Sequence, residues 1–128
     1  MTRSGPPALK LKIQLYCGDE IAMGPGKADL LEAIDESGSI SAAGRALGMS
    51  YRRAWLLVDT MNRCFAQPLV ETTPGGGKGS GAKVTAAGEA ILGAYRALER
   101  QLDDSARGEA RATLEEALRS APVPFQHD

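Results

Sequence analysis

Four polar residues that closely follow Gly48 have side chains suited to contact with nucleic acid. Ser50 and Tyr51 carry hydroxyl groups, which donate hydrogen bonds to phosphate oxygens. Arg52 and Arg53 carry guanidinium groups, and a guanidinium that binds guanine O6 and N7 bidentately discriminates against other bases by about 1–3 kcal/mol. A helix that begins here would also attract a phosphate through its free N–H groups. The four residues therefore predict a DNA contact, in which either arginine could read a base or hold a phosphate.

The elements that must position these residues have the pattern of a helix-turn-helix. A short helix over residues 42–47, with Ser41 as its N-cap, leads into a tight turn at Gly48. A second helix, capped by Ser50, is expected over residues 51–65. Such a motif places the start of its second helix in the major groove. We include Ser41 with the four residues above as a candidate DNA-binding residue.

The packing of the two helices follows from residue size and spacing. Small residues at Ala42, Ala43 and Gly44 allow the second helix to approach the first closely. The inward stripe of the second helix is predicted by its spacing to be Ala54 or Trp55, Val58, Met61 or Asn62, and Phe65. Trp55 is expected to face the core and hold the helix in place.

A glycine-rich segment, PGGGKGSGA over residues 74–82, supplies a second candidate DNA contact. It connects two stretches of β character, so it predicts a hairpin. As a wing, this hairpin would bring Lys78 and Lys83 to the flanking backbone or the minor groove. The pattern of a nucleotide-binding loop is absent, because Gly79 follows Lys78. A flexible linker without function is the alternative.

The charge distribution supports a DNA-binding segment although the chain has a net charge of −1. Residues 39–83 hold six cations and two anions, a net charge of +4, whereas the remainder holds nine cations and fourteen anions, a net charge of −5. Phosphate binding needs only local positive charge, because salt screens charges beyond about 8–10 Å.

The segment before the motif predicts two short strands and a helix. Residues 1–8 are expected to be a flexible leader. Strict alternation over residues 9–16 predicts a strand with Leu9, Leu11, Ile13 and Leu15 on a buried face. A returning strand is expected over residues 21–23. Pro25 is suited to begin a helix that runs to about Ser37, with Gly38 in the left-handed position after it.

A long helix is expected to follow the wing, with Thr85 as its cap. Its apolar seam recurs at four, three and four residues, which indicates a dimer interface formed by Ile91, Tyr95, Leu98 and Leu102. Packing of the same residues on the chain's own first strand and helix is the alternative. Gly108 could break the helix, so its continuation over residues 105–120 is left open.

Together these elements predict a mainly α fold with a small β-sheet (α+β): a winged helix-turn-helix with a long C-terminal dimerisation helix. The predicted parts are the leader 1–8, the DNA-binding domain 9–85, the helical dimerisation region 86–120 and a disordered tail 121–128. Hydrophobic residues are 43% and charged residues 24% of the chain, which is typical of a soluble globular protein. No apolar run is long enough to span a bilayer and no signal peptide is evident, so a cytoplasmic location without membrane contact is expected.

Catalysis and metal binding are not expected. His127 is the single histidine, so no Ser/His/Asp or Cys/His arrangement is credible. Cys17 and Cys64 are expected to be reduced, buried thiols without metal-ligand spacing. We predict neither an enzyme nor a bound cofactor or metal.

The stretch AIDESGSISAAGRALGMSYRRAWLLVDTMN, then LVET and GGGKGSGAKVTAAGEAIL, resembles the N-terminal DNA-binding domain of the ModE family, molybdate-responsive transcription regulators related here to LysR-type regulators. The most specific pieces are residues 38–44, residues 50–55, Met61-Asn62 and the glycine-rich wing. The resemblance covers about residues 9–105. It implies that residues 50–53 begin the recognition helix, that Lys78 lies in the wing, and that the last helix pairs two subunits at molybdenum-related promoters.

The chain departs from that family after its long helix. ModE regulators bind molybdate in C-terminal β-barrel domains, and no β-rich segment follows here, so we do not expect direct molybdate binding. The leading hypothesis is a homodimeric regulator of double-stranded DNA. The alternatives are a protein-interaction module that uses the winged helix as a scaffold, with Leu56 and Leu57 as candidate contacts, and a direct oxyanion sensor.

Overall fold

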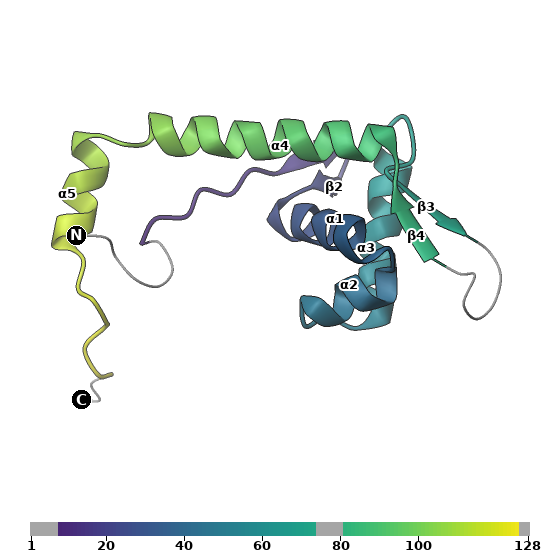
Figure 1. The fold of residues 1–128 in the computed structure, drawn as a ribbon. Helices are drawn as coiled ribbons and strands as arrows, with labels where there is room; N and C mark the ends of the chain where they lie inside the picture. The colour runs from purple at the N-terminus through teal and green to yellow at the C-terminus, as the bar shows by residue number, and fades with distance from the viewer. Residues whose placement is uncertain (1–7, 74–80, 126–128) are drawn as a thin grey trace.

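The computed structural model describes residues 8–73 and 81–125. The helices and strands are, in chain order, β1 (Leu15–Cys17), β2 (Glu20–Met23), α1 (Pro25–Ser37), α2 (Ile40–Ala46), α3 (Tyr51–Cys64), β3 (Val70–Thr73), β4 (Gly81–Val84), α4 (Ala86–Ser105) and α5 (Glu109–Ala117). Helices α1–α3 gather under one end of α4, the hairpin β3–β4 projects from that end, and α5 lies at the other (Figure 1). The architecture is a mainly helical winged helix-turn-helix with a long helix after it, as the sequence predicts.

Helix α1 has the ends that its sequence predicts, and one of its faces is apolar. Pro25 occupies the first turn, where its missing N–H group costs no hydrogen bond. Gly38 ends the helix in the left-handed region at φ 73°, and its N–H donates to the carbonyl of Ile34. Leu30, Leu31 and Ile34 are fully buried. Helix α1 is therefore the centre on which the other elements pack.

The turn between α2 and α3 depends on two glycines. Gly48 adopts φ 70°, which a residue with a side chain rarely accepts. A Cβ atom on Gly44 would lie 3.2 Å from the Cβ of Ala54, so the two helices meet at closer than usual range there. Ser50 caps α3 by accepting a hydrogen bond of 3.1 Å from the N–H of Arg53. The backbone of α3 is thus held at its first turn.

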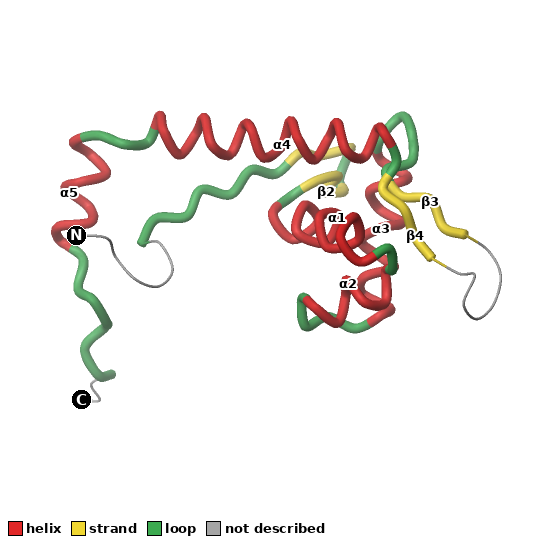
Figure 2. The backbone as a smooth tube through the Cα atoms, viewed as in Figure 1, coloured by secondary structure: helices red, strands yellow, loops and turns green. Residues whose placement is uncertain are grey.

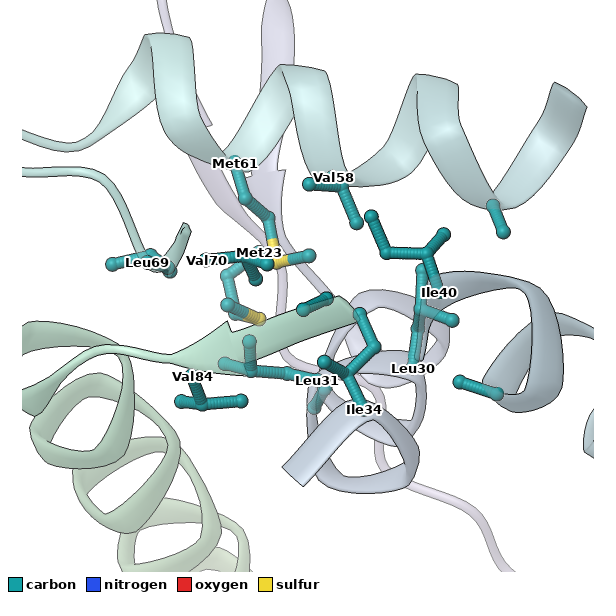
Figure 3. Close-up of a cluster of buried hydrophobic side chains, with 14 of the residues drawn as sticks. Met23, Leu30, Leu31, Ile34, Ile40, Val58, Met61, Leu69, Val70 and Val84 are labelled. Atoms are coloured by element: carbon teal, nitrogen blue, oxygen red, sulfur yellow. The ribbon is translucent and has the colours of Figure 1, made fainter. Parts of the chain in front are cut away.

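One hydrophobic core joins these helices to both hairpins (Figure 3). Its fully buried large side chains are Met23, Leu30, Leu31, Ile34, Val58, Met61 and Leu69. Side chains from β2, α1 and α3 therefore pack in one cluster with Leu69, which lies just before β3. This packing fixes the wing relative to α3.

The predicted strand over residues 9–16 is wrong for most of its length. Only Leu15–Cys17 pairs with β2, and residues 9–14 form an irregular stretch (Figure 2). A strand needs a partner strand for its backbone hydrogen bonds. The four residues of β2 are too few to pair with residues 9–14 as well. The hydroxyl of Tyr95 instead donates to the carbonyl of Ile13 at 2.7 Å, which satisfies one backbone acceptor. The predicted buried face is wrong for Leu11 and Leu15, which are 41% and 42% exposed, whereas Leu9 and Ile13 are half-buried.

The predicted cap of the first motif helix is wrong by two residues. Ser39, with an extended backbone, caps α2 by accepting from the N–H of Ala42 at 3.1 Å. The earlier start brings Ile40 into the core, where it is 5% exposed. The hydroxyl of Ser41 instead accepts a hydrogen bond of 2.8 Å from Arg45.

Trp55 does not face the core. Ala54 takes the inward position, because the close approach of Gly44 leaves room only for a methyl group. Successive residues on a helix point about 100° apart, so the neighbouring indole turns outward and is 37% exposed. The N–H of Trp55 donates to the hydroxyl of Tyr51.

The expected burial of both cysteines is wrong for Cys17, which is exposed on the short strand β1, whereas Cys64 is half-buried. Both thiols are free. Partial desolvation raises the pKa of the Cys64 thiol, and a hydrogen bond with the Cys17 thiol raises it further. Two residues distant in the sequence are thus neighbours where β1 meets the end of α3.

The long C-terminal helix ends at the first residue of the region 105–120, whose helical continuation the sequence left open. Thr85 caps α4 by accepting from the N–H of Gly88 at 3.0 Å, as predicted. Helix α4 ends at Ser105, and α5 begins after Gly108, which has φ 155°. Residues 106–120 therefore do not extend α4.

Candidate DNA-binding surface

The first turn of α3 presents its polar side chains to solvent. Ser50, Tyr51, Arg52 and Arg53 are all exposed. Neither Arg52 nor Arg53 has a carboxylate partner among the residues that the structure describes. Both guanidinium groups are consequently available to phosphate or to the edge of a base.

Tyr51 and Arg52 belong to a surface groove on α3 that also includes Trp55, Leu56 and Asp59. We call the first four of these the recognition face: Tyr51, Arg52, Trp55 and Leu56. Tyr51 is 57% and Leu56 is 52% exposed. Residues four apart are neighbours on one side of a helix, so Tyr51 lies beside Trp55 and Arg52 beside Leu56. The recognition face therefore combines a cation with apolar surface.

Arg63, unlike Arg52 and Arg53, is paired with carboxylates. Its guanidinium binds both carboxylate oxygens of Glu20 at 2.9 Å and one oxygen of Asp59 at 2.8 Å. The hydrogen bond and charge of Arg63 lower the pKa of Glu20, and the two carboxylates raise the pKa of Arg63. These contacts neutralise Arg63, so the cation count of the segment overstates the charge free to meet phosphate.

The wing is connected to the helix-turn-helix by backbone hydrogen bonds. The N–H of Ala82 donates to the carbonyl of Gly38 at 2.9 Å. Lys83 is exposed on β4 opposite Glu71 of β3. Lys78, the other predicted wing contact, lies outside the described residues.

Asn62 makes a connection that spacing alone did not reveal. Its carbonyl oxygen accepts from the N–H groups of Leu69 and Val70 at 2.8 and 3.1 Å, and its amide donates to the carbonyl of Val70 at 3.0 Å. The side chain thus continues the backbone pairing of β3 onto α3. The sequence pattern gave Asn62 only as an alternative to Met61 on the inward stripe. The signal in the sequence that could have indicated this role is an asparagine at a position expected to face inward on the helix.

The four residues of the predicted dimer seam differ in their surroundings. Tyr95 is 4% exposed and packs in the core of its own chain. For this residue the predicted alternative, packing within the chain, holds in place of a subunit contact. Ile91 is half-buried, whereas Leu98 and Leu102 are each 40% exposed. Ile91 and Leu98 border an apolar groove between α4 and the N-terminal hairpin, together with Leu15, Met23, Phe65, Ala94 and Tyr95. We treat Ile91, Leu98 and Leu102 as the remaining candidate contacts between subunits.

Residues 8–73 and 81–125 lack the features of two other classes of site, a metal centre and a membrane-spanning helix. No group of three or more histidine, cysteine or acidic side chains there could hold a metal ion. Over the same residues, none of the helices has the length and apolar character required to cross a bilayer.

Comparison with known proteins agrees with this geometry. Residues 27–89 match the family described as "Bacterial regulatory helix-turn-helix protein, lysR family". The chain is 49% identical over 77 residues to the molybdenum-pterin-binding protein MopB of Rhodobacter capsulatus, covering 60% of this chain and 28% of that one. It is 42% identical over 78 residues to the molybdenum transport protein ModE of Azotobacter vinelandii, covering 61% of this chain and 29% of that one.

A solved structure supports the fold. The DNA-binding domain of CbnR, crystallised with DNA, has a TM-score of 0.52 at 21% identity, over 71% of this chain and 95% of that one. The chain spans less than a third of the length of the two curated relatives. Residues 27–89 thus form a bacterial regulatory helix-turn-helix domain of the lysR family, and the chain around them is similar to ModE-type molybdenum proteins over about 60% of its length.

Proposed function

We propose that this DNA-binding transcription regulator recognises a specific sequence by placing the first turn of α3 in the major groove and the hairpin β3–β4 on flanking DNA. The observation that carries the proposal is the exposed pair Arg52 and Arg53, which has no carboxylate partner among the described residues. The cap at Ser50 fixes the backbone of this turn, which lowers the entropy lost when its side chains bind.

The experiment that tests this proposal is selection of bound fragments from fragmented genomic DNA by the full chain. Recovered fragments should share a short motif, and their affinity should fall steeply as salt rises, because each phosphate contact releases counterions. Fragments without a shared motif, bound with the same salt dependence, would contradict sequence-specific recognition.

We further propose that the regulator binds as a homodimer to a roughly palindromic site near molybdenum-related genes. Exposed Leu98 and Leu102 on α4 supply apolar area for a second subunit. The relatives MopB and ModE are a molybdenum-pterin-binding protein and a molybdenum transport protein, which supports molybdenum-related genes as the targets. Mapping the selected fragments onto the genome tests it: sites remote from molybdenum transport or molybdenum cofactor genes would contradict it.

A protein-interaction module is the second candidate, because Leu56 is exposed beside Arg52 on α3. An apolar side chain beside a cation is typical of a surface that contacts another protein. This candidate predicts no salt-sensitive DNA binding, so the selection experiment distinguishes the two functions.

A further inference from the structure

The recognition face has more apolar surface than phosphate binding requires. Tyr51, Trp55 and Leu56 are 57%, 37% and 52% exposed, on the helix that carries Arg52 and Arg53. Exposed aromatic and aliphatic side chains that cluster together mark a surface with a binding partner. The neighbouring free guanidinium groups indicate that this partner is anionic.

The hydrogen bond between Trp55 and Tyr51 decides what the indole can recognise. Indole has one polar group, its N–H donor, and no acceptor. That donor is already bonded to the Tyr51 hydroxyl. Trp55 therefore offers only carbon atoms to a partner, and Leu56 has only carbon atoms to offer. Neither residue can read a base by hydrogen bonding while this bond persists.

The major groove of duplex DNA contains one kind of apolar group on its base edges, the C5-methyl group of thymine. We propose that Trp55 and Leu56 determine specificity by packing against thymine methyl groups, while Arg52 on the same face binds a neighbouring phosphate or guanine. This inference rests on the proposed function of α3. It names the base that the apolar part of the recognition face selects.

The spacing of the residues suits this division of roles. Leu56 follows Arg52 by four residues, and Trp55 follows Tyr51 by four residues. Each apolar side chain therefore lies about one helical turn closer to the C-terminal end of α3 than its polar neighbour. A helix whose first turn enters the groove can bring its second turn within reach of the next base pairs. The polar and apolar contacts would then fall on adjacent positions of the site.

The test replaces thymine by deoxyuridine, which removes only the methyl group. Fragments selected by the full chain would be resynthesised with one thymine replaced at a time, and their affinities measured at constant salt. At each contacted thymine the wild-type chain should lose affinity about fourfold, the value for one buried methyl group. The Trp55→Ala and Leu56→Ala variants should each bind the thymine site more weakly, and each should no longer distinguish thymine from deoxyuridine at the position that the replaced residue contacts.

Leu114→Ala is the matched control, because Leu114 is 67% exposed on α5 and should leave both affinities unchanged. The deoxyuridine measurement on the wild-type chain is independent of the folding of any variant. Equal affinity for thymine and deoxyuridine at every position, with salt-sensitive binding intact, would overturn the methyl contact alone. Wild-type affinity in both alanine variants would overturn it too. Absence of salt-sensitive binding would overturn the proposed function itself.

Discussion

The cations of the helix-turn-helix differ in what they already bind. Arg63 is bound by two carboxylates, at 2.9 Å from Glu20 and 2.8 Å from Asp59. Arg45 donates to the hydroxyl of Ser41, a neutral partner. Arg52 and Arg53 meet no carboxylate in the described part of the chain. The formal charge of each residue is the same, yet the carboxylates around each one determine which charges remain for DNA.

Alanine substitution should reveal this difference. Arg52→Ala or Arg53→Ala should weaken binding of the selected DNA by about 1–3 kcal/mol, or about 5- to 150-fold, because a contact to a base or phosphate is lost. Arg63→Ala should change affinity by less than about threefold, since its charge is already neutralised. Fluorescence anisotropy at one salt concentration measures all three. A larger loss for Arg63→Ala than for Arg52→Ala would contradict this assignment.

A few close contacts hold α4 against the chain before β3 and against α1. Gly88, in the first turn of α4, lies so near the chain before β3 that a Cβ atom there would be 2.3 Å from the carbonyl oxygen of Leu69. The hydroxyl of Thr85 donates to the carbonyl of Pro68 at 2.7 Å. Further along α4, Arg96 forms ion pairs with Asp29 of α1 at 2.8 Å and with Glu99 of α4 itself at 3.0 Å. These contacts set the direction in which α4 leaves the domain.

Two glycines of α4 should therefore respond to alanine in opposite ways. Gly88→Ala should destabilise the fold by about 1–3 kcal/mol, because backbone atoms must move to admit the methyl group. Gly93→Ala should stabilise it by about 0.5–1 kcal/mol, since a Cβ there meets nothing within 4 Å and alanine favours a helix. Urea denaturation at a fixed protein concentration measures both. Equal effects of the same sign would contradict the close approach at Gly88.

The contact between α4 and the N-terminal stretch should be sensitive to pH. Burial raises the pKa of the Tyr95 phenol above its ordinary value, and the charge of Glu99 raises it further. The stabilisation is therefore complete below the unfolded pKa of about 10 and is lost as pH rises through the higher folded pKa. Tyr95→Phe should lower stability by about 1 kcal/mol at neutral pH, because the hydrogen bond to Ile13 is lost.

Urea midpoints between pH 8 and pH 11 provide the measurement for this contact. The wild-type midpoint should fall more steeply than that of Tyr95→Phe above pH 10. Parallel curves for the two proteins would show that the phenol does not ionise differently in the folded and unfolded chains.

The molecule as a whole separates a DNA-binding part from a helix with unpartnered apolar surface. Helix α4 extends well beyond the domain that it caps, and its far half carries exposed Leu98 and Leu102 (Figure 1). A second copy of the chain is the partner that we propose for this surface. Two recognition helices held by one pair of α4 helices would meet two half-sites whose separation the dimer sets.

The dimer is tested by charge on the proposed seam. Ile91→Asp together with Leu98→Asp should give a monomer with poor operator affinity, because a buried carboxylate is costly at an apolar interface. Leu98→Asp alone keeps the half-buried Ile91 in place and should weaken the dimer with less risk to folding. Leu114→Asp, on α5, is the control. Sedimentation equilibrium measures the mass, and a tight dimer in the double variant would count against the seam.

Local patterns were sufficient for the elements whose signals act over a few residues. Pro25, Gly38, Gly48, Ser50 and Thr85 mark helix ends and a turn, and each has the predicted role in the structure. Their effects depend on backbone conformation and on hydrogen bonds within three or four residues. The helix-turn-helix, the wing strands and the exposed start of α3 could therefore be predicted from spacing.

The tertiary structure alone decided which side chains face inward and which charges are free. Spacing allowed either Ala54 or Trp55 in the core, and the prediction that Trp55 faces inward is wrong: the approach of Gly44 selected Ala54. The alternation over residues 9–16 is a genuine strand pattern, but a strand forms only where a partner exists, and β2 is short. Partners remote in the sequence also determine the charge left on Arg63 and the burial of Tyr95. Such contacts depend on how elements far apart in the chain come together, and a periodicity of two or 3.6 residues contains no information about that arrangement.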